Sequence, residues 1–379
     1  MEPVELREDD LTLRPWQVGD VDALYAACQD PDIQRWTRIP SPYTRDDAYR
    51  FVTEYTPAAW ADGTRAPMGV FDTDTGELLG SSGLVALDQS TGIAELGYWT
   101  APGARGRSVA ERAARVVTRW SFDRVGVHRL EWRAKAGNHA SRLVALRLGV
   151  TMEGTVREPE PGIDIWAGAL LPGELRADSP DDPTLARAAQ QARTFSAEQP
   201  TVRAGTVLLR PPRVADVLDI VAACRDPDMV RYTTIPDPYE QADAEFFIRH
   251  AANLWRDGDG AIFAFEDEDG RYLGNLMLRL DQWPARLAEV GYSVAPWARG
   301  RGVASSALRE VCRWAFGSLA VDRVEWRAFV TNAASRRVAE KAGFRIEGTE
   351  RGRQMHRGNP VDTWYGALLA EDIDAAPPA

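Results

Sequence analysis

The sequence predicts two tandem domains, each a mixed α/β fold in which helices flank a β-sheet. Its length of 379 residues is enough for two or three domains with separate cores. An internal repeat points to two copies of one unit, because residues 26–32 (AACQDPD) recur as 222–228 (AACRDPD) and residues 131–134 (EWRA) recur as 325–328. A period of roughly 195 residues is a whole domain rather than a solenoid unit.

The repeat sets the expected domain boundaries. We expect the first domain in residues 1–175 and the second in residues 201–379. Between them, residues 178–183 are polar and turn-like, and residues 184–196 have a helix-forming composition with few large apolar side chains. We therefore expect residues 176–200 to be a linker whose short helix lies across a surface.

In the second domain, stretches with strand and helix patterns alternate in the order of a mixed α/β fold. The expected strands are residues 207–209, 261–266, 272–280, 289–294, 324–329, 344–347 and 363–369. The expected helices are residues 214–224, 241–255, 303–319 and 332–342. Gly343 follows the last helix, where glycine commonly ends a helix.

Composition and charge exclude several classes of function. The net charge of −11 and a pI near 5.1 argue against a nucleic-acid surface. The three cysteines, Cys28, Cys224 and Cys312, are too few and too dispersed for a disulfide framework or a zinc site, so no metal is expected. The acidic N-terminus and the lack of a long apolar run predict a cytoplasmic protein with no membrane partner.

A glycine-rich loop between a strand and a helix carries the clearest chemical signal. Residues 299–304 read Arg-Gly-Arg-Gly-Val-Ala, after the strand at 290–294 and before the helix at 303–319. Free backbone N–H groups and the positive end of the helix dipole favour a phosphate at such a place, and glycine lets the phosphate approach closely. The spacing matches neither a Walker loop nor a dinucleotide-binding loop.

The pattern Arg-x-x-Gly-x-Ala resembles the acetyl-CoA pyrophosphate loop of the GNAT superfamily of N-acyltransferases. Further segments resemble its RimJ/RimL-type branch most closely: Leu-Arg-Pro near each start, residues 289–292 (EVGY), Asn332-x-x-Ser335 and residues 340–344 (EKAGF). The resemblance covers the whole unit. It implies direct attack of a primary amine on the thioester of acetyl-CoA or another acyl-CoA, without a metal or a covalent enzyme intermediate.

The resemblance also implies roles for single residues. Glu289 would accept the amine proton, although a surface glutamate is an equal alternative. Ser335 would face the sulfur and stabilise the leaving thiolate, although helix capping by Asn332 could equally explain this motif. The residues expected to bind the cofactor are Tyr292, Val294, Arg299, Gly300, Arg301, Gly302, Val303, Ala304 and Asn332.

The acceptor is less well defined than the cofactor. Tyr232 and Tyr239 flank a segment that the family uses to cover the substrate, so both are expected to bind it, with core packing as an equally good account. His356 is expected on the surface. The amine could belong to a small molecule or to a protein N-terminus, and the oligomeric state is not predicted.

The two copies differ in the glycine loop. Ser108 stands where the second copy has Gly302, and a side chain there crowds a phosphate and disfavours a positive φ. We therefore expect the second domain to be catalytic and the first to have an altered cofactor loop. The alternatives are that both domains, or only the first, are catalytic, or that the protein binds acyl-CoA or another ligand without turnover.

Overall fold

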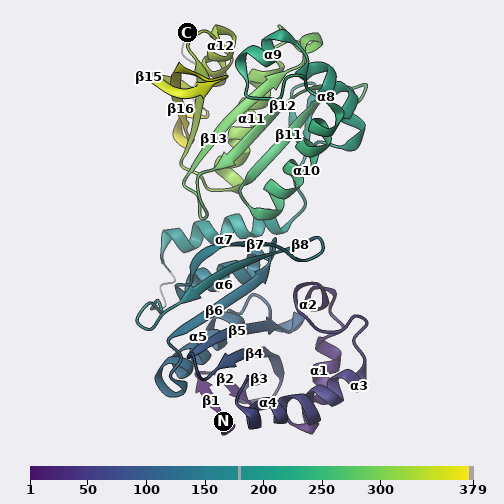
Figure 1. The fold of residues 1–379 in the computed structure, drawn as a ribbon, viewed down its shortest axis with the longest axis vertical. Coiled ribbons are helices and arrows are strands. Elements are labelled where there is room, and N and C mark those ends of the chain that lie inside the picture. Colours follow the sequence, from purple (N-terminus) through teal and green to yellow (C-terminus); the bar gives the residue numbers. More distant parts are fainter. Residues whose placement is uncertain (178–180, 375–379) are drawn as a thin grey trace. The chain divides into compact units, whose positions relative to one another are not determined.

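The computed structural model describes residues 1–177 and 181–374, and the chain divides into two compact units, Met1–Pro180 and Asp181–Ala379 (Figure 1). Each unit contains an eight-stranded mixed sheet with helices packed against it, which confirms the predicted fold class. Within the described residues, no helix is long and apolar enough to cross a membrane.

In the first unit the strand order is β1-β2-β3-β4-β5-β6-β8-β7, and only β5 and β6 run parallel to each other. The strands are β1 (Leu6–Glu8), β2 (Leu11–Arg14), β3 (Ala66–Asp72), β4 (Leu78–Asp88), β5 (Ile93–Thr100), β6 (Arg129–Lys135), β7 (Thr151–Glu160) and β8 (Ile163–Leu170). The helices are α1 (Val21–Ala27), α2 (Pro31–Trp36), α3 (Arg45–Arg50), α4 (Thr56–Asp62), α5 (Val109–Trp120) and α6 (His139–Leu148).

The second unit repeats this topology, with the order β15-β16-β14-β13-β12-β11-β10-β9 and a single parallel pair, β13 and β14. The strands are β9 (Val202–Ala204), β10 (Val207–Arg210), β11 (Gly260–Glu266), β12 (Tyr272–Leu280), β13 (Leu287–Val294), β14 (Arg323–Phe329), β15 (Arg345–His356) and β16 (Asn359–Leu369). The helices are α7 (Pro183–Ser196), α8 (Val217–Cys224), α9 (Pro227–Tyr232), α10 (Gln241–Asp257), α11 (Val303–Ser318) and α12 (Ala333–Ala342).

Helix α11 makes the crossover between the parallel strands β13 and β14, and it covers one face of the sheet (Figure 1). Its apolar side chains recur at helical spacing, so they form one buried stripe against Val290 of β13 and Trp326 of β14. The buried residues of this stripe are Val303, Ala307, Leu308, Val311, Cys312 and Ala315. This packing fixes the start of α11, and therefore the loop before it, relative to both strands.

A second core cluster includes residues of α8 and the buried side chains of Cys224, Tyr239 and Tyr272. Burial raises the pKa of the Cys224 thiol to about 11. The thiol is therefore protonated at neutral pH and behaves as a small apolar side chain. Cys28 of the first unit is buried in the same way.

The helix expected in the linker is an integral part of the second unit. Gln191 of α7 is completely buried, and its side chain bonds with the backbone of Ala285 and Leu319. The ring of Phe195 lies 4.8 Å from that of Trp255. The helix lies where it was expected, and few but well-placed side chains dock it to the second unit.

Two features near the end of β14 differ from the prediction. Helix α9 begins with Asp226 as its N-cap and Pro227 in its first turn, a recognisable start signal at the point where only the end of α8 was predicted. Strands β15 and β16 form a hairpin that is much longer than the predicted strands at 344–347 and 363–369. Polar side chains dominate this hairpin, so its apolar pattern is weak.

Candidate active site

The parallel strands β13 and β14 separate part-way along their length. They pair only from Leu287 opposite Arg323 to Val290 opposite Trp326. On its other edge β13 remains paired with β12 as far as Val294. From Gly291 onward, the edge of β13 that faces β14 therefore has backbone groups without ladder partners. The first domain has the same separation, since β5 and β6 pair only as far as Leu96 opposite Trp132.

The glycine loop follows β13 and leads into α11. Gly300 and Gly302 both adopt a φ of 75°, in the left-handed region that favours glycine. A Cβ added at either glycine would meet no atom within 4 Å, so the loop faces open space. The side chains of Val303 and Ala304 are buried, and only their backbone N–H groups, which lack intrahelical acceptors, can contact an anion.

The two arginines of this loop have different surroundings. Arg299 forms ion pairs with Asp226 and Asp228 at the start of α9, so its guanidinium anchors the loop to that helix. Burial alone would raise the pKa of Asp226, but the hydrogen bond and charge of Arg299 outweigh it and hold the pKa below its usual value. Arg301 is exposed, and no carboxylate of the described residues forms an ion pair with it. Arg301 is therefore the better placed of the two to meet an external anion.

The first domain keeps the shape of this loop despite the serine. Gly106 has a φ of 79°, and Ser108 adopts a φ of 55° and a ψ of 21° at the start of α5. Arg105 pairs with Asp30 and Asp32, as Arg299 does with Asp226 and Asp228. A left-handed conformation costs a non-glycine residue about 1–2 kcal/mol. The rest of the domain thus holds Ser108 in the conformation that its side chain disfavours.

A hydrogen-bond network joins the separated strands to α12. The hydroxyl of Tyr292 donates to the carbonyl oxygen of Ser335 at 2.7 Å, and the Ser335 hydroxyl lies 3.1 Å from that of Tyr292 and 3.2 Å from Trp326 Nε1. The Asn332 side chain accepts a bond from the Ser335 N–H and caps α12, which is the structural alternative the sequence left open. Burial raises the pKa of Tyr292, which keeps its hydroxyl protonated. Sequence reasoning did not foresee that the Tyr292 side chain holds Ser335.

Glu289 lies where β13 and β14 still pair, opposite Glu325. Its Oε2 atom is 3.1 Å from Nη1 of Arg327, and its side chain is 40% exposed. Arg327 also contacts Glu325 and Glu350, each at 3.2 Å, so three carboxylates surround one guanidinium. Sequence reasoning assigned no role to Arg327, although the repeated EWRA motif contains it.

The corresponding glutamate of the first domain is more enclosed. The side chain of Glu95 is only 17% exposed, with Arg38 Nη2 at 3.8 Å and Arg133 Nε at 3.9 Å from its carboxylate. Arg133 corresponds to Arg327 in the repeat. Arg38 corresponds to Thr234, so the second domain has no arginine at that position. The first domain therefore places one more cation over this carboxylate.

The residues expected to bind the acceptor lie in different surroundings. Tyr239 is 5% exposed and packs in the core, which is the arrangement that the packing alternative predicts. Tyr232 lies at the end of α9 and donates to the carbonyl oxygen of Thr331 at 3.2 Å. His356 is half-buried with its ring 4.9 Å from that of Phe329, so the expectation of a surface histidine was wrong.

A cavity of about 720 Å³ lies at the C-terminal end of β14, between α9 and the tip of the β15–β16 hairpin. Arg357 at the hairpin tip bonds to the carbonyl oxygens of Val230 and Ile235, so the tip is held against the segment that contains α9. The lining residues are Pro227, Val230, Arg231, Phe329, Val330, Thr331, His356, Arg357, Pro360, Val361 and Asp362.

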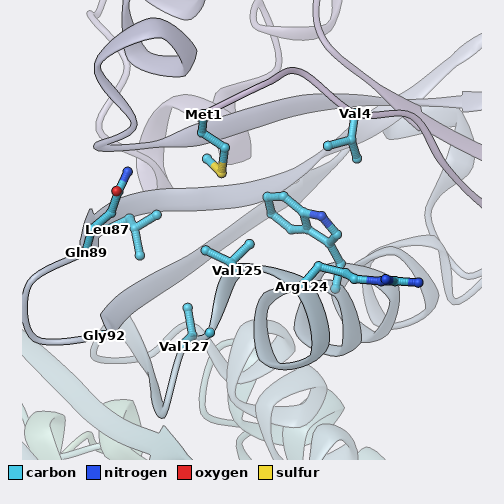
Figure 2. Close-up of a pocket in the computed structure, with 10 residues that line it drawn as sticks. Met1, Val4, Leu87, Gln89, Gly92, Arg124, Val125 and Val127 are labelled. Carbon is cyan, nitrogen blue, oxygen red and sulfur yellow. The ribbon is translucent and has the colours of Figure 1, made fainter.

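A second cavity, of about 500 Å³, lies in the first domain. Figure 2 shows Met1, Val4, Leu87 and Val125 around it. Its walls come from the N-terminal segment, the turn between β4 and β5, and the residues that follow α5. The glycine loop of this domain follows the opposite end of β5, so this cavity is separate from the region where β5 and β6 part.

Comparison with known proteins identifies the family of this chain. The family model described as an acetyltransferase (GNAT) domain matches residues 10–151 and again residues 206–345. The chain belongs to the GNAT acetyltransferase family. Each GNAT domain of this chain therefore contains the separated parallel strands and the glycine loop described above. GNAT domains use acetyl-CoA, and the family match supports an acyl-CoA-dependent N-acetyltransferase that acts on an amine.

Several relatives resemble parts of this GNAT chain. L-amino acid N-acetyltransferase AaaT of Escherichia coli is 39% identical over 103 residues, which are 27% of this chain and 64% of that enzyme. The uncharacterized N-acetyltransferase YoaA of Bacillus subtilis is 27% identical over 43% of this chain and 93% of its own length. Among solved structures, Mycobacterium smegmatis RimJ in complex with CoA-disulfide matches 47% of this chain and 90% of its own, with 24% identity and a TM-score of 0.43.

Proposed function

We propose that the second GNAT domain is the catalytic one and transfers an acetyl group from acetyl-CoA to a primary amine. The observation that carries this proposal is the separation of β13 from β14 directly before the open loop at Gly300 and Gly302. The backbone N–H groups of this loop and the side chain of Arg301 would bind the pyrophosphate. The gap between the strands would admit the thioester arm, which the unpaired N–H groups of β13 would hold.

Bound acetyl-CoA would supply an acyl group already activated as a thioester. Glu289 would take the proton of the attacking amine, directly or through a water, as the C–N bond forms. When Glu289 accepts this proton, its carboxylate becomes neutral and its ion pair with Arg327 is lost. The Arg327 guanidinium would then still be paired with the carboxylates of Glu325 and Glu350. The unpaired N–H groups of β13 beyond Gly291 would stabilise the oxygen that gains negative charge.

The leaving sulfur needs a hydrogen-bond donor as the C–S bond breaks. The hydroxyls of Ser335 and Tyr292 are 3.1 Å apart at the end of α12 that faces β13. The Tyr292 hydroxyl donates to the Ser335 carbonyl oxygen and would hold Ser335 in place. The Ser335 hydroxyl, which donates to the Tyr292 oxygen, would turn its proton to the thiolate. The buried cysteines are unsuited as nucleophiles, because burial raises their pKa values, so the amine would attack the thioester directly.

Two differences favour the second domain over the first. Gly302 leaves open space where Ser108 places a side chain in the first domain. Glu289 is more exposed than Glu95 and has one fewer arginine nearby. The first domain would therefore act mainly as a structural partner in the same chain.

The direct test is to incubate the purified full chain with acetyl-CoA and a panel of primary amines while following free thiol. Amine-dependent release of thiol, with recovery of the N-acetylated amine, is the expected result. Acyl-CoA binding without thiol release for any amine would instead support a binding protein. Release without an acetylated product would indicate hydrolysis of the thioester and contradict amine transfer.

A further inference from the structure

We propose that the cavity at the end of β14 recognises the acceptor and selects amines that also carry a carboxylate. This inference rests on the proposed function, because it assumes that the amine reacts beside Glu289. The cavity lies next to that place. Arg327, which contacts Glu289, and Phe329, which lines the cavity, project from the same face of β14, about 7 Å apart along the strand.

Charge is distributed unevenly between these two places. The carboxylates of Glu289, Glu325 and Glu350 surround the Arg327 guanidinium. Arg323 and Arg353 also pair with Glu325 and Glu350, so Glu289 is the one of the three that, within the described residues, shares its guanidinium and has no second cation. Its partly compensated charge can attract an ammonium group. In the cavity wall, Arg231 and Arg357 form no ion pair with any carboxylate of residues 1–177 and 181–374. An acceptor with an ammonium group at one end and an anionic group at the other matches this arrangement.

The one acidic residue among those that line the cavity offsets only one of the two arginines, so the wall keeps a net positive charge. One Asp362 oxygen accepts a hydrogen bond from the N–H of Gly352 at 2.8 Å, so this carboxylate serves the hairpin backbone. Arg357 binds two carbonyl oxygens at 3.3–3.4 Å, which leaves its charge uncompensated. Arg231 is exposed and lies 5.1 Å above the ring of Tyr232, free to turn toward the cavity. A carboxylate bound by a guanidinium makes the strongest type of hydrogen bond between side chains.

Two polar atoms beside Phe329 lack partners. His356, whose ring packs on Phe329, has an Nδ1 atom with neither solvent contact nor a hydrogen bond. Thr363 lies opposite Phe329 in the β14–β16 register, is fully buried and has an unpartnered hydroxyl. A buried polar atom without a hydrogen bond destabilises the folded protein. A polar ligand that displaces the Phe329 ring could form hydrogen bonds with His356 Nδ1 and the Thr363 hydroxyl. These two atoms therefore favour a polar ligand over an apolar one.

The first domain provides an internal contrast. Lys135 stands in place of Phe329, and its Nζ atom donates to the carbonyl oxygens of Arg35 at 2.7 Å and Thr37 at 3.4 Å. This lysine therefore bridges the end of β6 to the segment after α2, where the second domain has its cavity wall. Arg35 is the residue of the first domain that corresponds to Arg231. Its guanidinium lies over the ring of Trp36, as that of Arg231 lies over the ring of Tyr232. Arg35 is thus a matched control position.

The test compares acceptors that differ only in a carboxylate, using the full chain and acetyl-CoA. One pair is leucine and leucinamide, and the other is the peptide amides Ala-Asp-Ala and Ala-Asn-Ala, so the pairs distinguish a free amino acid from an acidic peptide. The acid of at least one pair should have the higher kcat/KM, by about 10- to 100-fold. Arg231→Ala should bring this ratio close to one, Arg231→Lys should restore part of it, and Arg35→Ala should leave it unchanged.

The KM for acetyl-CoA should stay constant in all three variants, which separates recognition of the acceptor from damage to the fold. Equal or better use of the amide in both pairs would overturn the inference, as would an Arg231→Ala variant that keeps the preference. If no amine is acetylated, the proposed function fails. Calorimetric titration of the same acids and amides into CoA-saturated protein then decides the inference: tighter binding of an acid, lost in Arg231→Ala, supports it, and equal affinities reject it.

Discussion

The two GNAT domains share their backbone construction and differ in a few side chains around the cleft. Both have parallel strands that part after four paired residues, a loop with two left-handed residues, and an asparagine that caps the following helix. Three of the differences bear directly on binding: Gly302 against Ser108, Phe329 against Lys135, and Thr234 against Arg38. A duplicated fold can therefore keep its shape while single side chains decide what each copy can bind.

The ion pairs that build the fold are among the shared features. Arg14 binds Asp20 with two hydrogen bonds in the first domain, as Arg210 binds Asp216 in the second. Such pairs link the first long strand of each sheet to the turn before the next helix. Their retention in both copies explains why Ser108 can be held in a left-handed conformation: the surrounding structure is fixed independently of the loop.

The largest expected contrast concerns the two glutamates. Glu289→Gln should lower kcat by about 10²–10⁴-fold, the usual effect of losing a general base, with little change in acyl-CoA affinity. Glu95→Gln should change the rate much less, because Glu95 is enclosed by arginines. Initial rates of thiol release measure both effects. If the Glu289→Gln enzyme keeps the normal rate, Glu289 is not the general base and is a surface residue paired with Arg327.

The next contrast concerns the glycine loops. Gly302→Asp should weaken acyl-CoA binding by about 10- to 100-fold, since a carboxylate in the nest of N–H groups repels phosphate and fills the open space. Ser108→Asp should weaken it far less. Calorimetric titration with acetyl-CoA gives both affinities. Equal losses would mean that both domains bind acyl-CoA, and no loss in either variant would disprove the assignment of the loop.

The exchange of Phe329 for its counterpart tests the acceptor side. Phe329→Lys should raise the KM for the acceptor about 10-fold and leave the KM for acetyl-CoA unchanged, because a lysine there can bridge to carbonyl oxygens of the segment after α9, as Lys135 does in the first domain. Lys135→Phe should have no effect on either KM. A change in both KM values of Phe329→Lys would show that the end of β14 supports the fold rather than the acceptor.

The smallest contrast concerns the ion pairs that anchor the loops. Asp226→Asn and Asp30→Asn should each lower the free energy of unfolding by about 0.2–1 kcal/mol at neutral pH, as expected of partly exposed pairs, while asparagine keeps the helix cap. The pKa of Asp226 is lowered in the folded state, so its contribution is present above the unfolded pKa and is lost as the pH falls through the folded pKa.

Denaturant titrations at several pH values measure this loss, and the difference between wild type and variant should disappear in acid. Of the two substitutions, only Asp226→Asn should also raise the KM for acetyl-CoA. A stability difference that persists in acid would show that packing rather than charge is responsible.

Local and periodic signals agree for the elements that could be predicted best. The strand at 272–280 and the start of the helix at Val303 were predicted with boundaries that match the structure, and the repeat correctly indicated two similar domains. The docking of α7 was not foreseen, because Gln191 and Phe195 have no periodic signature in a polar helix. The length of the β15–β16 hairpin was underestimated for a related reason, since the exposed β15 lacks an apolar face.

Sequence motifs were enough to locate the candidate site, but they did not predict which side chains contact one another in it. The loop residues and Glu289 came from spacing, whereas the contacts of Arg327, Tyr292 and Phe329 depend on which strands lie side by side. Strand order is a tertiary property that one sequence does not specify locally. The ion pair between Arg299 and Asp226 joins residues far apart in the chain, so the motif could not show that this arginine also anchors the loop.

The central claim is that catalysis belongs to the second domain, and paired inactivation of each domain in the full chain tests it most directly. One variant carries Glu289→Gln with Gly302→Asp, and its matched control carries Glu95→Gln with Ser108→Asp. Amine-dependent thiol release should fall to the background rate in the first variant and stay within about twofold of wild type in the second. Full activity of the first variant together with loss of activity in the second would contradict the account.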